Sequence, residues 1–366
     1  MAIISFEDRF GYYLVQYGPH EYRTCSKIEA LQLAQRNNGG VSWHFNDNIY
    51  SNYDWTQEIS EEITELYRQR AEQLRNKFDH VVIMYSGGYD SHNMLESFLQ
   101  NSIKVDAIVS FYNSMDNNTD TDITLEWELQ TLPRLKPILD AHPEIEFIRM
   151  DISQNSLDML DRYDDDYLYV SDGSLAPNFV GASYLGQLLP TRFQTGTLAM
   201  IYGIDKPRLR YKDNQFIFNF YDQGFRVRPI TPGSGMEYFY WNEDVPKLVI
   251  KQAQIAKKFW AANIDFLNSH PKNKHNTNLG IVLDHDWAPL QKMIYPYCAN
   301  GIFLTWRPAS ATFGQRDIWI YRSNTEYRTK LVNIYKSFKQ HVDRSWMNQG
   351  SYFKGLVGHP SKDYIL

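Results

Sequence analysis

The residues best placed to do chemistry form the run Ser86 to Ser91, which reads Ser-Gly-Gly-Tyr-Asp-Ser. Val81 to Tyr85, just before it, has the apolar and β-favouring character of a buried strand. The residues after it place apolar side chains at helical spacing on one face: Met94, Leu95, Phe98 and Leu99. Two adjacent glycines let the backbone bend sharply and approach an anion closely. A helix that begins behind them offers unpaired N–H groups and the positive end of its dipole. The spacing therefore predicts a strand–turn–helix phosphate site.

This motif resembles S-G-G-x-D-S, the pyrophosphate-binding loop of the N-type ATP pyrophosphatase (PP-loop) superfamily, which is adenine nucleotide alpha hydrolase-like. Asparagine synthetase, GMP synthetase, NAD synthetase and tRNA-lysidine synthetase share the loop. In that family it holds the β- and γ-phosphates while ATP is cleaved between the α- and β-phosphates. The substrate is adenylated, and a nucleophile then displaces AMP. The resemblance therefore implies ATP and Mg²⁺ as cofactors.

Carried over by position, the resemblance assigns roles to all six residues of the motif. Asp90 would bind Mg²⁺ and take part in catalysis. The remaining residues would bind the pyrophosphate: Ser86, Gly87, Gly88, Tyr89 and Ser91. The loop is neither a Walker A loop, which would need GxxxxGKS/T, nor a GxGxxG turn.

A second site element is predicted after the strand Thr197 to Tyr202, in the run Gly203-Ile-Asp-Lys-Pro-Arg208. In the asparagine synthetase branch a later strand ends in SGEGADE, whose acidic residues face pyrophosphate and Mg²⁺. The present run is similar in placement only, because it keeps a glycine and one acid but lacks the Glu and the second acid. By this resemblance Gly203 would lie at the pyrophosphate, and Asp205 would help to hold Mg²⁺. Lys206 or Arg208 would neutralise the pyrophosphate.

The elements around these loops alternate between strand and helix. Strands are predicted at Val105 to Tyr112 and Ile145 to Met150, with a helix over Leu125 to Ala141 that is interrupted by Pro133 and Pro137. Such alternation from 80 to 151 is typical of an α/β fold with a doubly wound parallel sheet. The PP-loop resemblance implies the same fold, of the HUP (adenine nucleotide alpha hydrolase-like) class.

Three parts of the chain are predicted. Residues 1–55 form a small N-terminal α+β module, in which Gly18-Pro19 follows a strand and Ser26 caps a helix that ends near Asn37 to Gly40. Residues 56–245 form the PP-loop ATP-binding α/β domain, with a helix over Glu58 to Phe78 and a hairpin insertion at 209–229. Residues 246–366 form a largely helical C-terminal part packed on that domain. Its polar tail, Gly358 to Tyr364, is predicted to fray.

Composition excludes several classes of protein. Hydrophobic residues make up 43% and charged residues 22% of the 366, so the chain is globular rather than disordered. The formal net charge of −6 gives no overall attraction to nucleic acid, although net charge alone does not decide whether a local basic patch exists. Cys25 and Cys298 form no CxxC, so neither a structural zinc site nor a disulfide framework is expected. With neither a secretory signal nor a membrane span in the sequence, the expected location is cytoplasmic.

The expected function is that of an ATP-dependent, AMP- and pyrophosphate-forming ligase. It would activate a carboxylate or carbonyl oxygen of a small molecule for attack by an amine or by ammonia from a separate source. This is asparagine-synthetase-like without the glutaminase, because the chain starts Met-Ala-Ile and has no N-terminal Cys nucleophile. One alternative is a PP-loop nucleobase-modifying enzyme acting on tRNA, DNA or a deazapurine. Another is a non-catalytic nucleotide-binding regulatory protein, which would not need Asp90. No membrane partner is expected.

Overall fold

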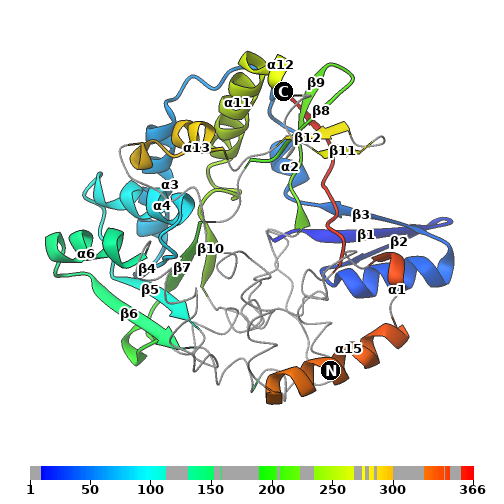
Figure 1. Ribbon diagram of the computed structural model, residues 1–366, viewed down its shortest axis with the longest axis horizontal. Helices are drawn as coiled ribbons and strands as arrows, with labels where there is room; N and C mark the ends of the chain where they lie inside the picture. Colours follow the sequence, from blue (N-terminus) through cyan, green and yellow to red (C-terminus); the bar gives the residue numbers. More distant parts are fainter. Residues whose placement is uncertain are drawn as a thin grey trace.

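Figure 1 shows the computed structural model of the chain. It describes residues 10–112, 131–151, 158, 189–203, 207–222, 235–267, 274–276, 280–283, 287–299, 325–341, 343–346 and 356–366. Within these residues the protein is a mixed α/β structure with a parallel sheet, an N-terminal antiparallel sheet and a second antiparallel sheet. Among the helices that the structure describes, none is both long and apolar enough to cross a bilayer.

The parallel sheet has five strands in the order β10-β7-β4-β5-β6. Their bounds are Met236–Tyr238 for β10, Leu198–Tyr202 for β7, His80–Met84 for β4, Ala107–Tyr112 for β5 and Glu146–Asp151 for β6. Every neighbouring pair is parallel. The chain starts in the middle at β4, runs outward through β5 and β6, and then returns to the other side of β4 for β7 and β10. The direction of winding therefore reverses between β4 and β7, and the predicted parallel α/β arrangement is confirmed at this level.

Helices lie around this sheet, and two of them pack directly on its central strand (Figure 1). Their bounds are Ile63–Lys77 for α3, Tyr89–Leu99 for α4, Leu132–Ala141 for α6, Lys247–Ala262 for α11 and Ala288–Ile294 for α13. Both α3 and α4 contact β4, and α3 also contacts α4 and α11. Val81, Val82 and Ile83 are fully buried, as expected for a strand with both faces covered.

One helix prediction needs correction at its start and another at its first proline. The helix expected from Glu58 begins at Ile63, and the backbone N–H of Ile59 instead bonds to Gln254 Oε1 of α11 at 3.0 Å. Pro133 does not interrupt α6, because it lies in the first turn, where a missing N–H removes no helical bond. Pro137 lies inside the same helix. Residues 125–130 of that prediction lie outside the described residues.

The N-terminal part contains the predicted strands and helix. The antiparallel sheet β2-β1-β3 is built from Tyr12–Tyr17 (β1), His20–Thr24 (β2) and Gly40–His44 (β3), and is followed by the short helix α2, Asp47–Tyr50. Helix α1, Lys27–Asn37, begins at Ser26, whose Oγ accepts from the N–H of Glu29 at 3.3 Å. It ends at Asn38 in a left-handed conformation, a common helix stop.

Three short strands lie within the C-terminal part, which the sequence predicts to be largely helical. The predicted hairpin is present as β8, Leu209–Lys212, and β9, Gln215–Phe218, joined by Asp213 and Asn214 at positive φ. The strands β11, β12 and β13 extend this hairpin into a five-stranded antiparallel sheet in the order β11-β12-β8-β9-β13. Their bounds are Lys274–Asn276, Gly280–Val282 and Tyr364–Ile365. Strands this short carry too few residues for a recognisable alternation.

The remaining described elements of the C-terminal part are helical. They are α12 (Ile264–Leu267), η6 (Pro296–Cys298), α15 (Thr325–His341) and η8 (Arg344–Trp346), and an earlier turn η4 spans Thr191–Gln194. With α11 and α13, the helices after residue 246 make up most of the described secondary structure of the C-terminal part. The division of the chain at residues 55 and 245 remains a prediction.

The expectation of a frayed tail is wrong. Tyr364 and Leu366 are buried, and β13 pairs with β9. The buried carboxylate of Asp222 accepts from Lys27 Nζ at 2.6 Å, from Tyr13 OH at 2.7 Å and from the N–H of His359 at 2.9 Å. Burial alone would raise the pKa of Asp222, but Lys27 outweighs it and holds that pKa below its usual range. Hydrogen bonds to the buried carboxylate of Asp222 therefore link the tail to the N-terminal part of the chain.

Candidate functional site

The motif Ser86 to Ser91 lies where the sequence predicts it, between β4 and α4. Gly88 is the N-cap of α4, and the helix begins at Tyr89. The loop follows the carboxyl end of β4, beside the reversal of strand order between β4 and β7. In open α/β sheets, ligands bind outside the carboxyl ends of the strands at such a switch point. The position and the helix N-terminus therefore both suit an anion.

The two serines of the motif hold the turn closed. Ser91 Oγ accepts from the N–H of Ser86 at 3.2 Å and lies 3.1 Å from Ser86 Oγ. It also donates to the carbonyl of Gly88 at 3.3 Å. Between them Gly87 has a φ of +73°, which favours glycine. The motif is thus a tight turn with its ends tied together by one side chain.

Asp90 occupies the first turn of α4 and is partly exposed. Its Oδ1 accepts from the N–H of Ser91 at 2.8 Å, so the carboxylate sits at the positive end of the helix. Its backbone carbonyl accepts from Tyr240 OH at 2.7 Å. The carboxylate of Asp90 therefore lies at the loop, and its backbone carbonyl is held by Tyr240, which belongs to the segment that follows β10.

Gly203 lies against the first turn of α4. It directly follows β7, and a Cβ added to it would lie 3.1 Å from the carbonyl carbon of Asp90 and 3.2 Å from the nitrogen of Ser91. Both neighbouring atoms are backbone, so a side chain here would be tightly packed and would have to displace α4 by a few tenths of an ångström.

Replacing Gly203 with Ala is expected to lower the free energy of unfolding by about 1–3 kcal/mol, the usual cost of overpacking. The added methyl would press on backbone atoms of the first turn of α4, which relax less easily than a flexible side chain. Urea unfolding of both forms measures the change. Gly40→Ala is the matched control, because a Cβ at Gly40 meets nothing within 4 Å. Equal unfolding midpoints for the two variants would contradict the close packing.

The other residues predicted after β7 are not brought to the loop by any described contact. Asp205 and Lys206 lie outside the described residues. The guanidinium of Arg208 lies over the ring of Tyr221, 5.4 Å from its centroid, next to the antiparallel sheet. Gly203 therefore lies at the loop, whereas the described contact of Arg208 is with Tyr221 and not with the loop.

Sequence reasoning missed two residues of α6 that contact the loop. Thr131 Oγ1 donates to the carbonyl of Ser86 at 3.0 Å, and Arg134 Nη1 donates to the carbonyl of Gly87. A Cβ on Gly87 would lie 2.8 Å from Thr131 Cα, so α6 and the loop are in direct contact. The sequence does not reveal these contacts with the loop. A basic residue is ordinary in a predicted helix, and the contacts depend on how α6 packs against the loop.

The far side of the loop helix is buried against the C-terminal part. Asn93 Nδ2 donates to Tyr240 OH at 3.4 Å, and Asn93 Oδ1 accepts from the N–H of Tyr297 at 3.4 Å. Cys298 Sγ donates to the carbonyl of Tyr89 at 3.3 Å. Burial, together with the negative charge of Asp90, raises the pKa of the Cys298 thiol well above its ordinary value. Cys298 therefore stays protonated near neutral pH and contributes packing rather than a thiolate.

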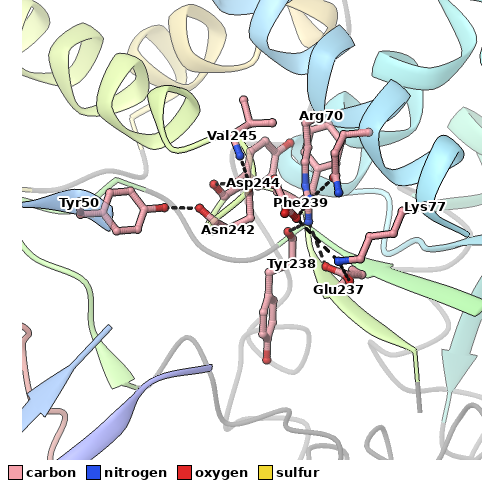
Figure 2. Close-up of polar contacts among 11 residues, drawn as sticks. Tyr50, Arg70, Lys77, Glu237, Tyr238, Phe239, Asn242, Asp244 and Val245 are labelled. Atoms are coloured by element: carbon pink, nitrogen blue, oxygen red, sulfur yellow. Dashed lines mark hydrogen bonds and ion pairs between the residues drawn. The ribbon is translucent and has the colours of Figure 1, made fainter. Parts of the chain in front are cut away.

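Figure 2 shows how the segment that carries Tyr240 is held in place. The fully buried Arg70 of α3 donates through Nη2 to the carbonyl of Tyr238 at 2.8 Å and to Glu237 Oε2 at 3.2 Å. Its Nη1 donates to Asp244 Oδ2 at 2.9 Å. Tyr50, from α2, donates to the carbonyl of Asn242 at 2.5 Å. The residues on both sides of Tyr240 are therefore fixed by α3 and by the N-terminal part.

The donor set around the loop limits the kind of metal site that could form there. Among the described residues, no group of three or more His, Cys, Asp or Glu side chains is arranged to hold an ion. Mg²⁺ bound with a nucleotide usually takes one or two carboxylates, and phosphate oxygens and waters complete its shell. A single carboxylate at the loop, that of Asp90, fits such an ion.

Neither models of known protein families nor curated proteins gave a match to this sequence. The function proposed for the chain therefore depends on the geometry of its own loop.

Proposed function

We propose that the chain is an ATP-dependent adenylating enzyme of the PP-loop superfamily, which converts ATP to AMP and pyrophosphate. It would activate a carboxylate or carbonyl oxygen of a small molecule for attack by an amine or ammonia, in the manner of asparagine synthetase but without a glutaminase. The observation that carries the proposal is the placement of Ser-Gly-Gly-Tyr-Asp-Ser at the switch point of the parallel sheet, where it opens α4.

Two further observations support a nucleotide at this place. In the strand order β10-β7-β4-β5-β6, the neighbouring strands β4 and β7 end beside each other; β4 is followed by the Ser86–Ser91 turn and β7 by Gly203. Gly203 packs on the first turn of α4, so the end of β7 contacts the helix that the loop begins. This arrangement is the one that a HUP-type nucleotide-binding fold would need.

In the proposed reaction the substrate oxygen attacks the α-phosphorus of ATP. The bond from the α-phosphorus to the bridging oxygen breaks, and the electron pair leaves with pyrophosphate. The loop amides and the N-terminus of α4 would stabilise this growing negative charge because they are already oriented before reaction. Asp90 would hold Mg²⁺, which supplies further positive charge to the phosphates when bound. Lys206 remains the proposed additional cation, with Asp205 as a second Mg²⁺ ligand.

Product analysis with purified protein, ATP and Mg²⁺ tests the proposal. We expect AMP and pyrophosphate, stimulated by one member of a panel of carboxylates, amino acids, deazapurines, tRNA and DNA. The β,γ-imido analogue of ATP should still release AMP, whereas the α,β-methylene analogue should not, because only the second blocks the bond in question. Release of ADP and phosphate would contradict the proposal.

The same panel separates the alternatives. Stimulation by tRNA, DNA or a deazapurine would identify a nucleobase-modifying enzyme that uses the same loop chemistry. Tight ATP binding with no cleavage in the presence of any panel member would favour a regulatory nucleotide-binding protein. The carboxylate of Asp90 at the loop favours turnover, because a protein that only binds nucleotide has no need for a catalytic metal ligand.

A further inference from the structure

The first turn of α6 uses its side chains in an unexpected way. Thr131 occupies the N-cap position of α6, yet its side chain makes no capping bond to that helix. Its hydroxyl donates to the carbonyl of Ser86 at 3.0 Å instead, although Thr131 is buried and 45 positions away in sequence. One turn later Arg134 donates to the carbonyl of Gly87. Two successive loop carbonyls are therefore bonded from one helix.

These bonds fix the direction of the loop amides. In a trans peptide the N–H points opposite to the C=O. Because the carbonyl of Ser86 faces α6, the N–H of Gly87 faces away from it, and the bond to Gly87 turns the N–H of Gly88 in the same way. Successive N–H groups around a residue with positive φ, such as Gly87, can form a concave anion site.

We propose that the first turn of α6 is a positioning element of the phosphate site, in which Thr131 and Arg134 hold two loop carbonyls so that the amides of Gly87 and Gly88 face the pyrophosphate part of ATP. This inference rests on the function proposed above and adds to it two residues with a defined role.

Arg134 also brings a positive charge to the loop. Burial raises the pKa of Tyr85 and of Cys298, and the charge of Arg134 counteracts that rise in both. The positive charge of Arg134 thus acts both on the end of the strand before the loop and on a residue packed against the loop helix. Since an Arg side chain stays protonated, this charge is present at any pH at which the protein is folded, and it favours an anion nearby.

Binding of inorganic pyrophosphate and of ATP, measured by calorimetry, tests the inference. We expect Thr131→Val and Arg134→Ala each to bind both ligands about tenfold more weakly, the loss typical of one positioning hydrogen bond. Thr131→Ser keeps the hydroxyl and should bind as the wild type does, and Arg134→Lys should recover part of the affinity. Lys136→Ala is the matched control, because Lys136 is an exposed residue of the same helix that pairs with Asp140.

The outcomes separate positioning from stability. A purely structural role would lower the melting temperature of Thr131→Val and leave the affinity of the folded protein unchanged, which would overturn the inference. If Arg134→Ala does not fold, the comparison of Thr131→Val with Thr131→Ser decides alone, since valine and threonine have nearly the same shape. If the wild type binds neither pyrophosphate nor ATP, the proposed function itself fails, and the inference fails with it.

Discussion

Asp90→Asn is expected to reduce the release of AMP from ATP by about a thousandfold, because a metal ion supplies several kcal/mol of charge stabilisation and each ~1.4 kcal/mol is a factor of ten. The variant should fold normally. An asparagine Oδ1 can still accept from the N–H of Ser91, as the carboxylate does at 2.8 Å. The loss of a negative charge at a helix N-terminus costs about 0.3–1 kcal/mol, which is small beside the expected change in rate. AMP release and the melting temperature are the two measurements.

Asp140→Asn serves as the matched control for this variant. Asp140 is an exposed acid of α6 that pairs with Lys136, so the same acid-to-amide change there should leave both rate and melting temperature unaltered. Raising the Mg²⁺ concentration should restore part of the activity of Asp90→Asn if the lost ligand is a metal ligand. Wild-type AMP release by Asp90→Asn would exclude the assigned role.

The loop and the parallel sheet could be predicted because their signals are local. Ser86 to Ser91 is a contiguous motif, and the strand before it is a continuous apolar run that is buried on both faces. Alternation of strand and helix between 80 and 151 then constrains the sheet to be parallel. Gly203 could be placed by the same logic, since it directly follows a predicted strand of that sheet.

The supports of the loop could not be predicted, because they depend on distant parts of the chain. Thr131 is 45 positions from Ser86, and Tyr240 is 150 positions from Asp90. Neither residue type is unusual where it stands in the sequence. The tail is a similar case: the polar character of 358–364 suggests fraying, whereas the acceptor that orders it, Asp222, is 137 positions from His359.

Arg70 makes buried contacts that the periodicity of its helix does not predict. Its helix is amphipathic, and the sequence places its charges on a solvated face, yet Arg70 is fully buried. The guanidinium meets Glu237, Asp244 and the carbonyl of Tyr238. A buried pair adds little net stability over an apolar substitute, but removal of one partner leaves an uncompensated charge in a medium that solvates it poorly. Glu237 is itself buried, and without Arg70 its carboxylate would keep a cation, the half-exposed Lys77, whose Nζ lies 3.4 Å from Glu237 Oε1.

Arg70→Met is therefore expected to lower the free energy of unfolding by about 3–5 kcal/mol, the usual cost of breaking a buried ion pair. Methionine fills part of the space but cannot donate to Glu237 or to the carbonyl of Tyr238. Urea unfolding followed by circular dichroism measures the loss. A second variant, Arg70→Met with Glu237→Gln, should recover part of it, because the amide carries no charge and costs less to bury.

Arg68→Met is the control on the same helix. Arg68 pairs with Glu65 and Glu72, but all three side chains are more than a third exposed to solvent, so the unfolding midpoint should change little. Because Arg70 fixes the residues on either side of Tyr240, its loss should also loosen the bond from Tyr240 OH to the carbonyl of Asp90. The folded fraction of Arg70→Met should then bind ATP more weakly than Arg68→Met does. Equal stability of the two variants would mean that the buried cluster is not what holds the segment behind the loop.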